Sequence, residues 1–233
     1  MTKYEACLPK HTWEIAGEDV PAFERDMKRI CDAARGRGAD LAQLVEARKV
    51  AVDERVTWKC RIPLCECYGQ CHMDPPLSPT AEETAKVVGK YEYAILTDIG
   101  MELPKDYWDF VQTEDLPLCR FQYTDEAMEF ERHTQIPLWN KLHEIVMGIE
   151  RDAHNLGYLF AMGYVASTCY LCYDPSNPIA YCDTSKPCRR PYEARPSMEA
   201  SGMDVFSTYR NAGLQLRLAS PERLSWSGLV LIV

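Results

Sequence analysis

Apolar residues at helical spacing mark the first predicted element, over residues 21–35. The apolar positions are Phe23, Met27, Ile30 and Cys31. They fall on one face, which predicts an amphipathic helix packed against a core. Gly36 and Gly38 follow, and glycines in this place favour the end of a helix.

Three later stretches also predict helices. Thr80 is a suitable N-cap for a helix that begins at Ala81, with two glutamates in its first turn. A long helix is expected over about residues 125–156, broken near Pro137, because its apolar positions follow the helical period. A short helix is expected over residues 204–212, where a glycine follows it.

Alternating patterns and apolar runs predict the strands. The predicted strands are residues 50–58, 91–99, 214–218 and 229–233. Residues 41–46 fit a short helix or a strand, and residues 158–168 fit a strand or a buried helix. We expect an α+β fold in one compact domain, with a mixed sheet, one long helix and irregular residues 1–19.

The composition is that of a globular chain with an acidic surface. The 233 residues are 46% apolar and 26% charged, and the formal net charge is −9. An acidic chain is a poor partner for nucleic acid. Residues 81–131 hold thirteen acids and four bases, which fits a solvated face or a docking face for a basic partner. No stretch approaches the roughly 18 apolar residues of a membrane span, so no membrane association is expected.

Eleven cysteines are the most unusual feature of the composition. The first residues lack the apolar core of a secretory signal, so we expect a cytoplasmic protein, where disulfides are rare. An odd number of cysteines also excludes a scheme in which all of them are paired. The cysteines are therefore better interpreted as metal ligands than as disulfides.

Four cysteines gather in a second loop, residues 169–199. Cys169 and Cys172 are spaced C-x-x-C, and Cys182 and Cys188 follow. The C-x-x-C turn aims two sulfurs at one metal or one cluster face. Prolines in the loop reduce the entropy that is lost when it wraps a cofactor. Four thiolates suit a 4Fe–4S cluster or a four-cysteine zinc site, and the spacing does not separate the two.

A first cysteine loop spans residues 60–79. Its cysteines are Cys60, Cys65, Cys67 and Cys71. The spacing is compact enough for one cluster, with Gly69 supplying a tight turn. His72 and Asp74 are candidate ligands without sulfur. A separate interpretation is that one of the four cysteines is a spectator.

Basic residues accompany the second loop. Lys186, Arg189, Arg190 and Arg195 would offset the negative charge of a cluster and raise its reduction potential. The same run also fits a solvated surface or a docking patch for a phosphate-like group. Glu199, which follows closely, could act as an acid or base, but the expected role is a helix cap or a salt bridge with Arg195.

The two loops carry a resemblance to a known family. Its motifs here are Lys59-Cys60, Cys65, Tyr68-Gly69, Pro75-Pro76, Glu150, Gly157-Tyr158, the C-x-x-C pair, Cys182, Cys188, Arg195-Pro196-Ser197-Met198-Glu199-Ala200 and Gly202-Met203-Asp204-Val205. Over about residues 45–215 the chain resembles the cysteine-rich predicted metal-binding protein family of anaerobic bacteria and archaea, a family of unknown function. The resemblance implies metal binding, and iron–sulfur binding in particular, but it supplies no reaction.

The first loop departs from the family pattern at one position. Where the family has Cys-Pro-Pro, this chain has Asp74-Pro75-Pro76. Cys67 and Cys71 are then additional. Either one of them replaces the missing thiolate, or Asp74 supplies an oxygen ligand, or the first loop holds no metal.

The residues and the resemblance together predict an iron–sulfur protein. We expect one or two 4Fe–4S clusters, two if both loops are loaded. Clusters with four thiolate ligands transfer electrons, so the expected role is an electron-transfer or accessory subunit that serves a redox partner protein or a larger complex. The alternatives are an enzyme with substrate bound at an irregular first cluster and a structural zinc scaffold. The sequence contains no phosphate-binding glycine motif and no H-E-x-x-H motif.

Overall fold

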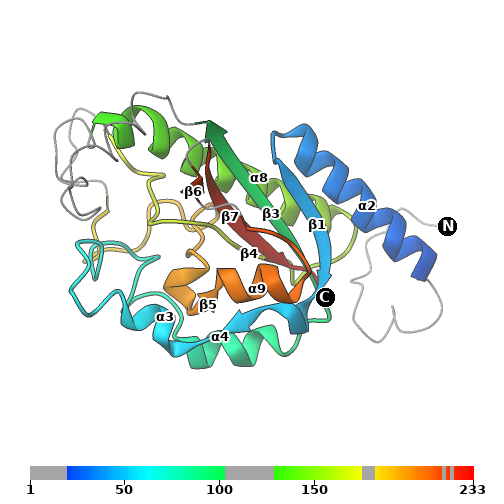
Figure 1. Cartoon of the computed structure of the whole chain (residues 1–233), viewed down its shortest axis with the longest axis horizontal. Helices are drawn as coiled ribbons and strands as arrows, with labels where there is room; N and C mark the ends of the chain where they lie inside the picture. Colours follow the sequence, from blue (N-terminus) through cyan, green and yellow to red (C-terminus); the bar gives the residue numbers. More distant parts are fainter. Residues whose placement is uncertain (1–19, 103–128, 175–181, 217–218, 221–222) are drawn as a thin grey trace.

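The computed structural model describes residues 20–102, 129–174, 182–216, 219–220 and 223–233 (Figure 1). Its centre is an antiparallel sheet in the order β1-β3-β7-β4, with β6 also paired to β7. The strands are β1 (Leu41–Glu46), β3 (Tyr93–Glu102), β4 (Met162–Tyr164), β6 (Ala219–Ser220) and β7 (Arg223–Leu231). Together with the helices, this sheet confirms the α+β fold. The predicted mixed sheet is wrong, because every strand pairing among the described residues is antiparallel.

Helices cover both faces of the sheet. Helices α2 (Val20–Gly36) and α8 (Ile136–Asn155) pack on one face. Helix α9 (Val205–Asn211) and the short pair β2 (Ala51–Val52) and β5 (Met203–Asp204) lie on the other (Figure 1). Along β3, Ile95 joins the core under α2 and α8, whereas Ala94 and Leu96 join the core under α9. Because both faces are covered, residues 93–96 of β3 form an apolar run without polar alternation, and the Thr97 that follows is also buried.

The predicted helices are confirmed within the described residues. Helix α2 ends at Gly36, as its glycines predicted. Helix α4 (Ala81–Val88) begins with a capping box, in which Thr80 and Glu83 each satisfy the other's backbone N–H. Pro137 lies in the first turn of α8, directly after a π-helical turn at Glu131–Gln135. The start of this predicted helix, residues 125–128, lies outside the described residues.

Two strand predictions are wrong. Residues 50–58 form only the short strand β2, because the Asp53 side chain accepts a hydrogen bond from the Arg55 N–H and caps helix α3 (Glu54–Trp58). Of the predicted strand 214–218, residues 214–216 form no strand, and residues 217–218 lie outside the described residues. In their place the two-residue strand β6 pairs with β7, which begins at Arg223, earlier than the apolar run predicted. Of the two open stretches, residues 41–46 form strand β1, and residues 158–168 contribute strand β4. The predicted irregular segment 1–19 lies outside the described residues.

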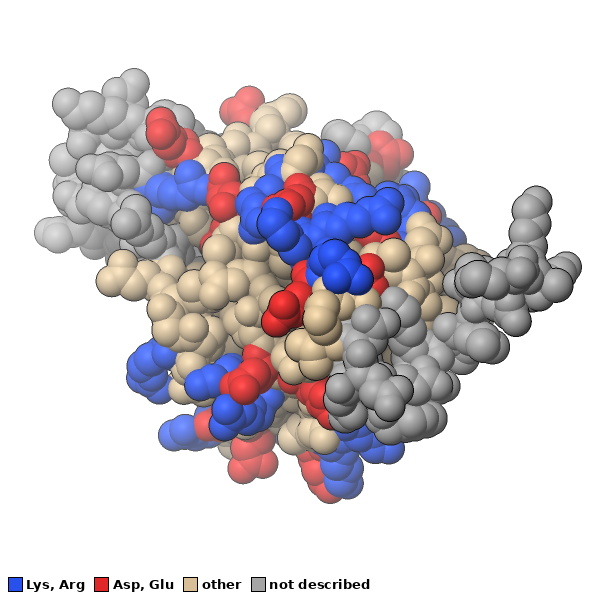
Figure 2. Space-filling model, turned by 90° about the vertical axis from the view of Figure 1, so that its right-hand side faces the viewer, with Lys and Arg blue, Asp and Glu red and all other residues tan. Residues whose placement is uncertain are grey.

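The side of the molecule that carries α2 has a mixed-charge surface. Figure 2 shows lysine and arginine side chains gathered there, with acidic side chains among them. On α2 itself, the exposed Asp32 accepts from Lys28 at 2.6 Å and from Arg35 at 2.8 Å. Within the described part of the chain, no helix has both the length and the apolar character needed to cross a bilayer.

Candidate metal-binding site

The second cysteine loop leaves the sheet and returns to it at one point. After β4, the Val165 N–H donates to the Pro196 carbonyl at 2.9 Å, and the Met198 N–H donates to the Val165 carbonyl at 2.8 Å. Val165 and Ser197 thus form a parallel bridge. The chain between them carries all four cysteines of this loop, so its two ends are held together at the edge of the core.

One carboxylate of α8 fixes both ends of the loop. Glu150 accepts from Arg195 Nε at 2.8 Å and from Nη2 at 2.6 Å, and it also accepts from the Gly163 N–H. The Glu150 and Arg195 side chains are 4% and 16% exposed. A Cβ on residue 163 would lie 2.8 Å from Glu150 Oε1, so the close approach requires glycine. Of the roles expected for Glu199, the salt bridge with Arg195 is wrong, because Arg195 pairs with Glu150 of α8. Glu199 itself begins a short 3-10 helix, η4 (Glu199–Ser201).

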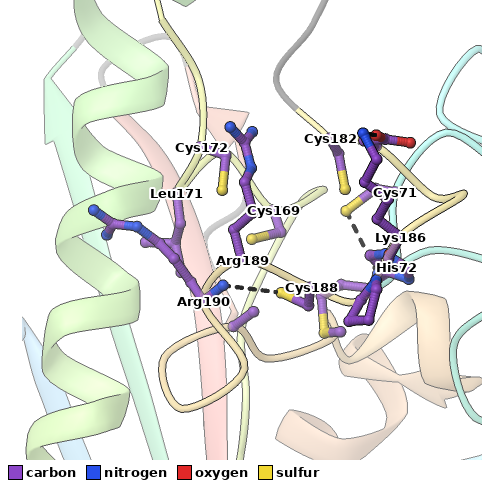
Figure 3. Close-up of a pocket in the computed structure, with 14 residues that line it drawn as sticks. Cys71, His72, Cys169, Leu171, Cys172, Cys182, Lys186, Cys188, Arg189 and Arg190 are labelled. Atoms are coloured by element: carbon purple, nitrogen blue, oxygen red, sulfur yellow. Dashed lines mark hydrogen bonds and ion pairs between the residues drawn. The ribbon is translucent and has the colours of Figure 1, made fainter.

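Five cysteines line one cavity of about 470 Å³ (Figure 3). They are Cys71, Cys169, Cys172, Cys182 and Cys188. Figure 3 shows Cys71 and Cys182 on one side of a common space and Cys169 and Cys172 on the other. Apolar side chains, His72 and Asp183 complete the wall. Three exposed basic residues, Lys186, Arg189 and Arg190, stand at its rim, and Lys186 pairs with Asp183 at 2.9 Å.

The thiols in the cavity interact with one another. Cys71 hydrogen-bonds to Cys169, which together with burial raises the pKa of Cys71, and the same bond lowers the pKa of Cys169. Burial raises the pKa of Cys182. Backbone N–H groups also donate to sulfur, from Met73 to Cys71 and from Arg190 to Cys188, each at 3.4 Å. Such bonds favour the thiolate, which is the form that binds metals.

Cys71 reaches this cavity because the end of the first loop is attached to the second. His72 Nε2 donates to the Lys186 carbonyl at 2.7 Å. The buried Asp74 accepts from the hydroxyl of Thr168, the residue before Cys169. Burial raises the pKa of Asp74 to about 6. The side chain of Asp74 therefore lies between the two cysteine loops rather than inside the first one.

The other three cysteines of the first loop stay apart from this cavity. Cys65 hydrogen-bonds to Cys67, and burial raises the pKa of Cys67 and of Cys60. Cys60 and Cys65 line a separate cavity of about 590 Å³, together with Glu199. Of the eight cysteines in the two loops, five therefore line one cavity and three lie apart from it. Their spacing in the sequence had predicted two groups of four. Among the described residues, no group of three or more His, Cys, Asp or Glu side chains is placed to hold a metal ion.

Comparison with known proteins assigns the chain to a family. No curated protein and no solved structure matches it. A family model described as predicted metal-binding protein (DUF2284) matches residues 43–232. This range includes the five cysteines of the cavity and the pair Glu150 and Arg195, which anchors the second loop. The chain therefore belongs to this family of predicted metal-binding proteins.

Proposed function

We propose that the five-cysteine cavity holds an iron–sulfur cluster and that the protein transfers electrons as an accessory subunit of a redox system. The observation that supports this most directly is the convergence of Cys71 with the four cysteines of the second loop around one cavity. A 4Fe–4S cluster takes four thiolate ligands. We assign them to Cys169, Cys172, Cys182 and Cys188, with Cys71 as the alternative to one of these.

The arrangement of the sulfurs favours a cluster over a single zinc ion. A zinc site draws four ligands to about 2.3 Å from one centre. Here the thiols stand around the walls of a cavity of about 470 Å³, which suits a group with several metal atoms. A bound cluster would supply one-electron chemistry, with a potential set by charge, hydrogen bonds to sulfur and exposure to solvent.

The protein supplies the groups that tune such a centre. The N–H groups of Met73 and Arg190 already donate to cysteine sulfurs, and donors of this kind raise a reduction potential. Leu171 and Ala194 give part of the wall an apolar surface. The basic residues at the rim would balance thiolate charge. Because they are exposed, they would also face a redox partner protein.

The test is a pair of cysteine variants in protein purified without oxygen. Cys169→Ser removes a thiol of the cavity, whereas Cys31→Ser removes a buried thiol of the α2 core. We expect wild type and Cys31→Ser to be brown and to give an electron paramagnetic resonance signal after reduction. Cys169→Ser should lose that signal or change its g values. Identical spectra for all three proteins, or no colour in any of them, would contradict the proposal.

A further inference from the structure

We propose that a second cavity, beside the cysteines, binds a small oxyanion, either a phosphate or a carboxylate. This cavity has a volume of about 410 Å³, and three basic side chains, Arg37, Lys141 and Arg151, contribute to its wall. Leu171 lines it as well as the cysteine cavity. Neither the cysteine motifs nor the family match points to this site.

Arg37 is the most constrained of the three bases. Its Nη2 donates to Asp152 at 2.6 Å, which fixes the plane of the guanidinium group. The side chain lies against the backbone of α8 at Gly148, where a Cβ would come within 2.8 Å of Arg37 Nε. Its Nη1 is buried and has no hydrogen-bond partner among the described residues. A buried guanidinium donor without a partner is unfavourable, and an anion in the cavity would satisfy it.

The charges around the cavity also favour an anion. Arg151 is exposed and forms no ion pair within the described ranges of the chain. Lys141 pairs with Glu144 at 2.9 Å in an exposed salt bridge. Burial lowers the pKa of His143, which keeps its imidazole neutral near neutral pH. The lining therefore has three cationic groups and two carboxylates, Glu144 and Glu193, and Glu193 is paired with Arg190. Two of the cations are guanidinium groups, which bind oxyanions through paired N–H donors.

The cavity adjoins the proposed redox centre. Apart from the shared Leu171, the two cavities are connected by a salt bridge of 3.0 Å between Arg190 at the cysteine cavity and Glu193 at the basic one. A bound anion would lie next to the cysteines, where a substrate or effector of that centre would act. The site itself rests on Arg37 and Arg151 and does not require the cluster.

The experiment is calorimetric titration of the full chain with inorganic phosphate and, separately, with acetate. Two variants test the site. Arg151→Gln removes an exposed charge, and Gly148→Ala displaces Arg37 while replacing a helical glycine by a better helix former. The control is Arg29→Gln, which removes an exposed charge of α2 outside the cavity. Melting curves and iron content are recorded on the same samples.

We expect phosphate, acetate or both to bind the wild type, and the identity of the ion that binds distinguishes the two sources of oxyanion. The Kd should rise by about tenfold in Arg151→Gln and in Gly148→Ala and stay unchanged in Arg29→Gln. Absence of binding at millimolar concentration would overturn the site. A Kd that is unchanged in Arg151→Gln would also overturn the site. A Kd that rises equally in Arg29→Gln would overturn it too, because it would indicate general attraction to surface charge. Binding that persists in iron-free protein would support the site whatever the outcome for the cluster.

Discussion

Arg195 donates two hydrogen bonds to Glu150, at 2.8 and 2.6 Å, and this pair joins the end of the second cysteine loop to helix α8. The same carboxylate accepts from Gly163, which lies just before the loop. A single residue of the long helix therefore determines where the loop leaves the core and where it returns. The position of the cysteine cavity depends on this buried pair.

Replacing Glu150 by alanine should destabilise the protein strongly. Arg195 would be left as a largely buried cation without its partner, and such a loss lowers the free energy of unfolding by about 3–5 kcal/mol. Urea denaturation measures the change. The matched control is Glu193→Ala, which removes a half-exposed salt bridge to Arg190 and should lower the free energy of unfolding by less than about 1 kcal/mol. Equal effects of the two substitutions would contradict the role of Glu150.

Replacing Gly163 by alanine should loosen the same anchor from the other side. The new Cβ would overlap Val146 Cγ1 and lie 2.8 Å from Glu150 Oε1, and overpacking of this kind lowers the free energy of unfolding by about 1–3 kcal/mol. Gly36→Ala is the control, because a Cβ there meets no atom within 4 Å. Chemical denaturation of both variants gives the comparison. A Gly163→Ala protein as stable as Gly36→Ala would show that the contact tolerates a methyl group.

Substitutions of Cys71 and of Cys67 should have different effects on the spectrum of the metal centre, although the two residues are only four positions apart in the sequence. Cys71→Ser removes a thiol of the five-cysteine cavity, whereas Cys67→Ser removes one from the separate group of three. We therefore expect Cys71→Ser to change the spectrum of the centre that Cys169→Ser disrupts, and Cys67→Ser to leave that spectrum intact. Electron paramagnetic resonance of the reduced proteins checks this. A spectrum of that centre that is unchanged in both variants would restore the grouping by sequence position.

His143 should make stability depend on pH. Its side chain is 1% exposed, and burial lowers its folded pKa below the ordinary value of 6.5. Below pH 6.5 the unfolded chain then binds a proton that the folded protein does not, so this contribution to stability is present above pH 6.5 and is lost as the pH falls. The free energy of unfolding should decrease between about pH 8 and about pH 5.5, and less so in His143→Gln.

The control for this prediction is His154→Gln, since His154 is exposed. Denaturation curves at both pH values, for all three proteins, separate the effect of His143 from titration elsewhere. A His143→Gln protein that loses as much stability on acidification as the wild type would contradict the assignment.

Local signals in the sequence were sufficient to predict the boundaries of several helices. The glycines at the end of α2 and the Thr80 capping box each act within one turn of helix, so neighbouring residues are enough to predict where these helices end and begin. The short helix α3 was missed because the valines before it alternate like a strand. Asp53 then caps a helix that its neighbours only weakly favour.

The grouping of the cysteines could not be predicted from spacing. Cys71 is placed by contacts across the chain, namely Asp74 with Thr168, 94 residues apart, and His72 with Lys186, 114 residues apart. The partner of Arg195 is likewise 45 residues away. Such contacts depend on how α8 and the two loops pack, and spacing within one loop carries no information about them.

The most direct test of the cluster is the content of iron, acid-labile sulfide and zinc in wild-type protein purified without oxygen. We predict about four iron and four sulfide per chain for a single 4Fe–4S cluster in the five-cysteine cavity. Twice these amounts would mean that Cys60, Cys65 and Cys67 hold a second cluster. Zinc without sulfide would contradict the iron–sulfur proposal and leave a structural zinc protein.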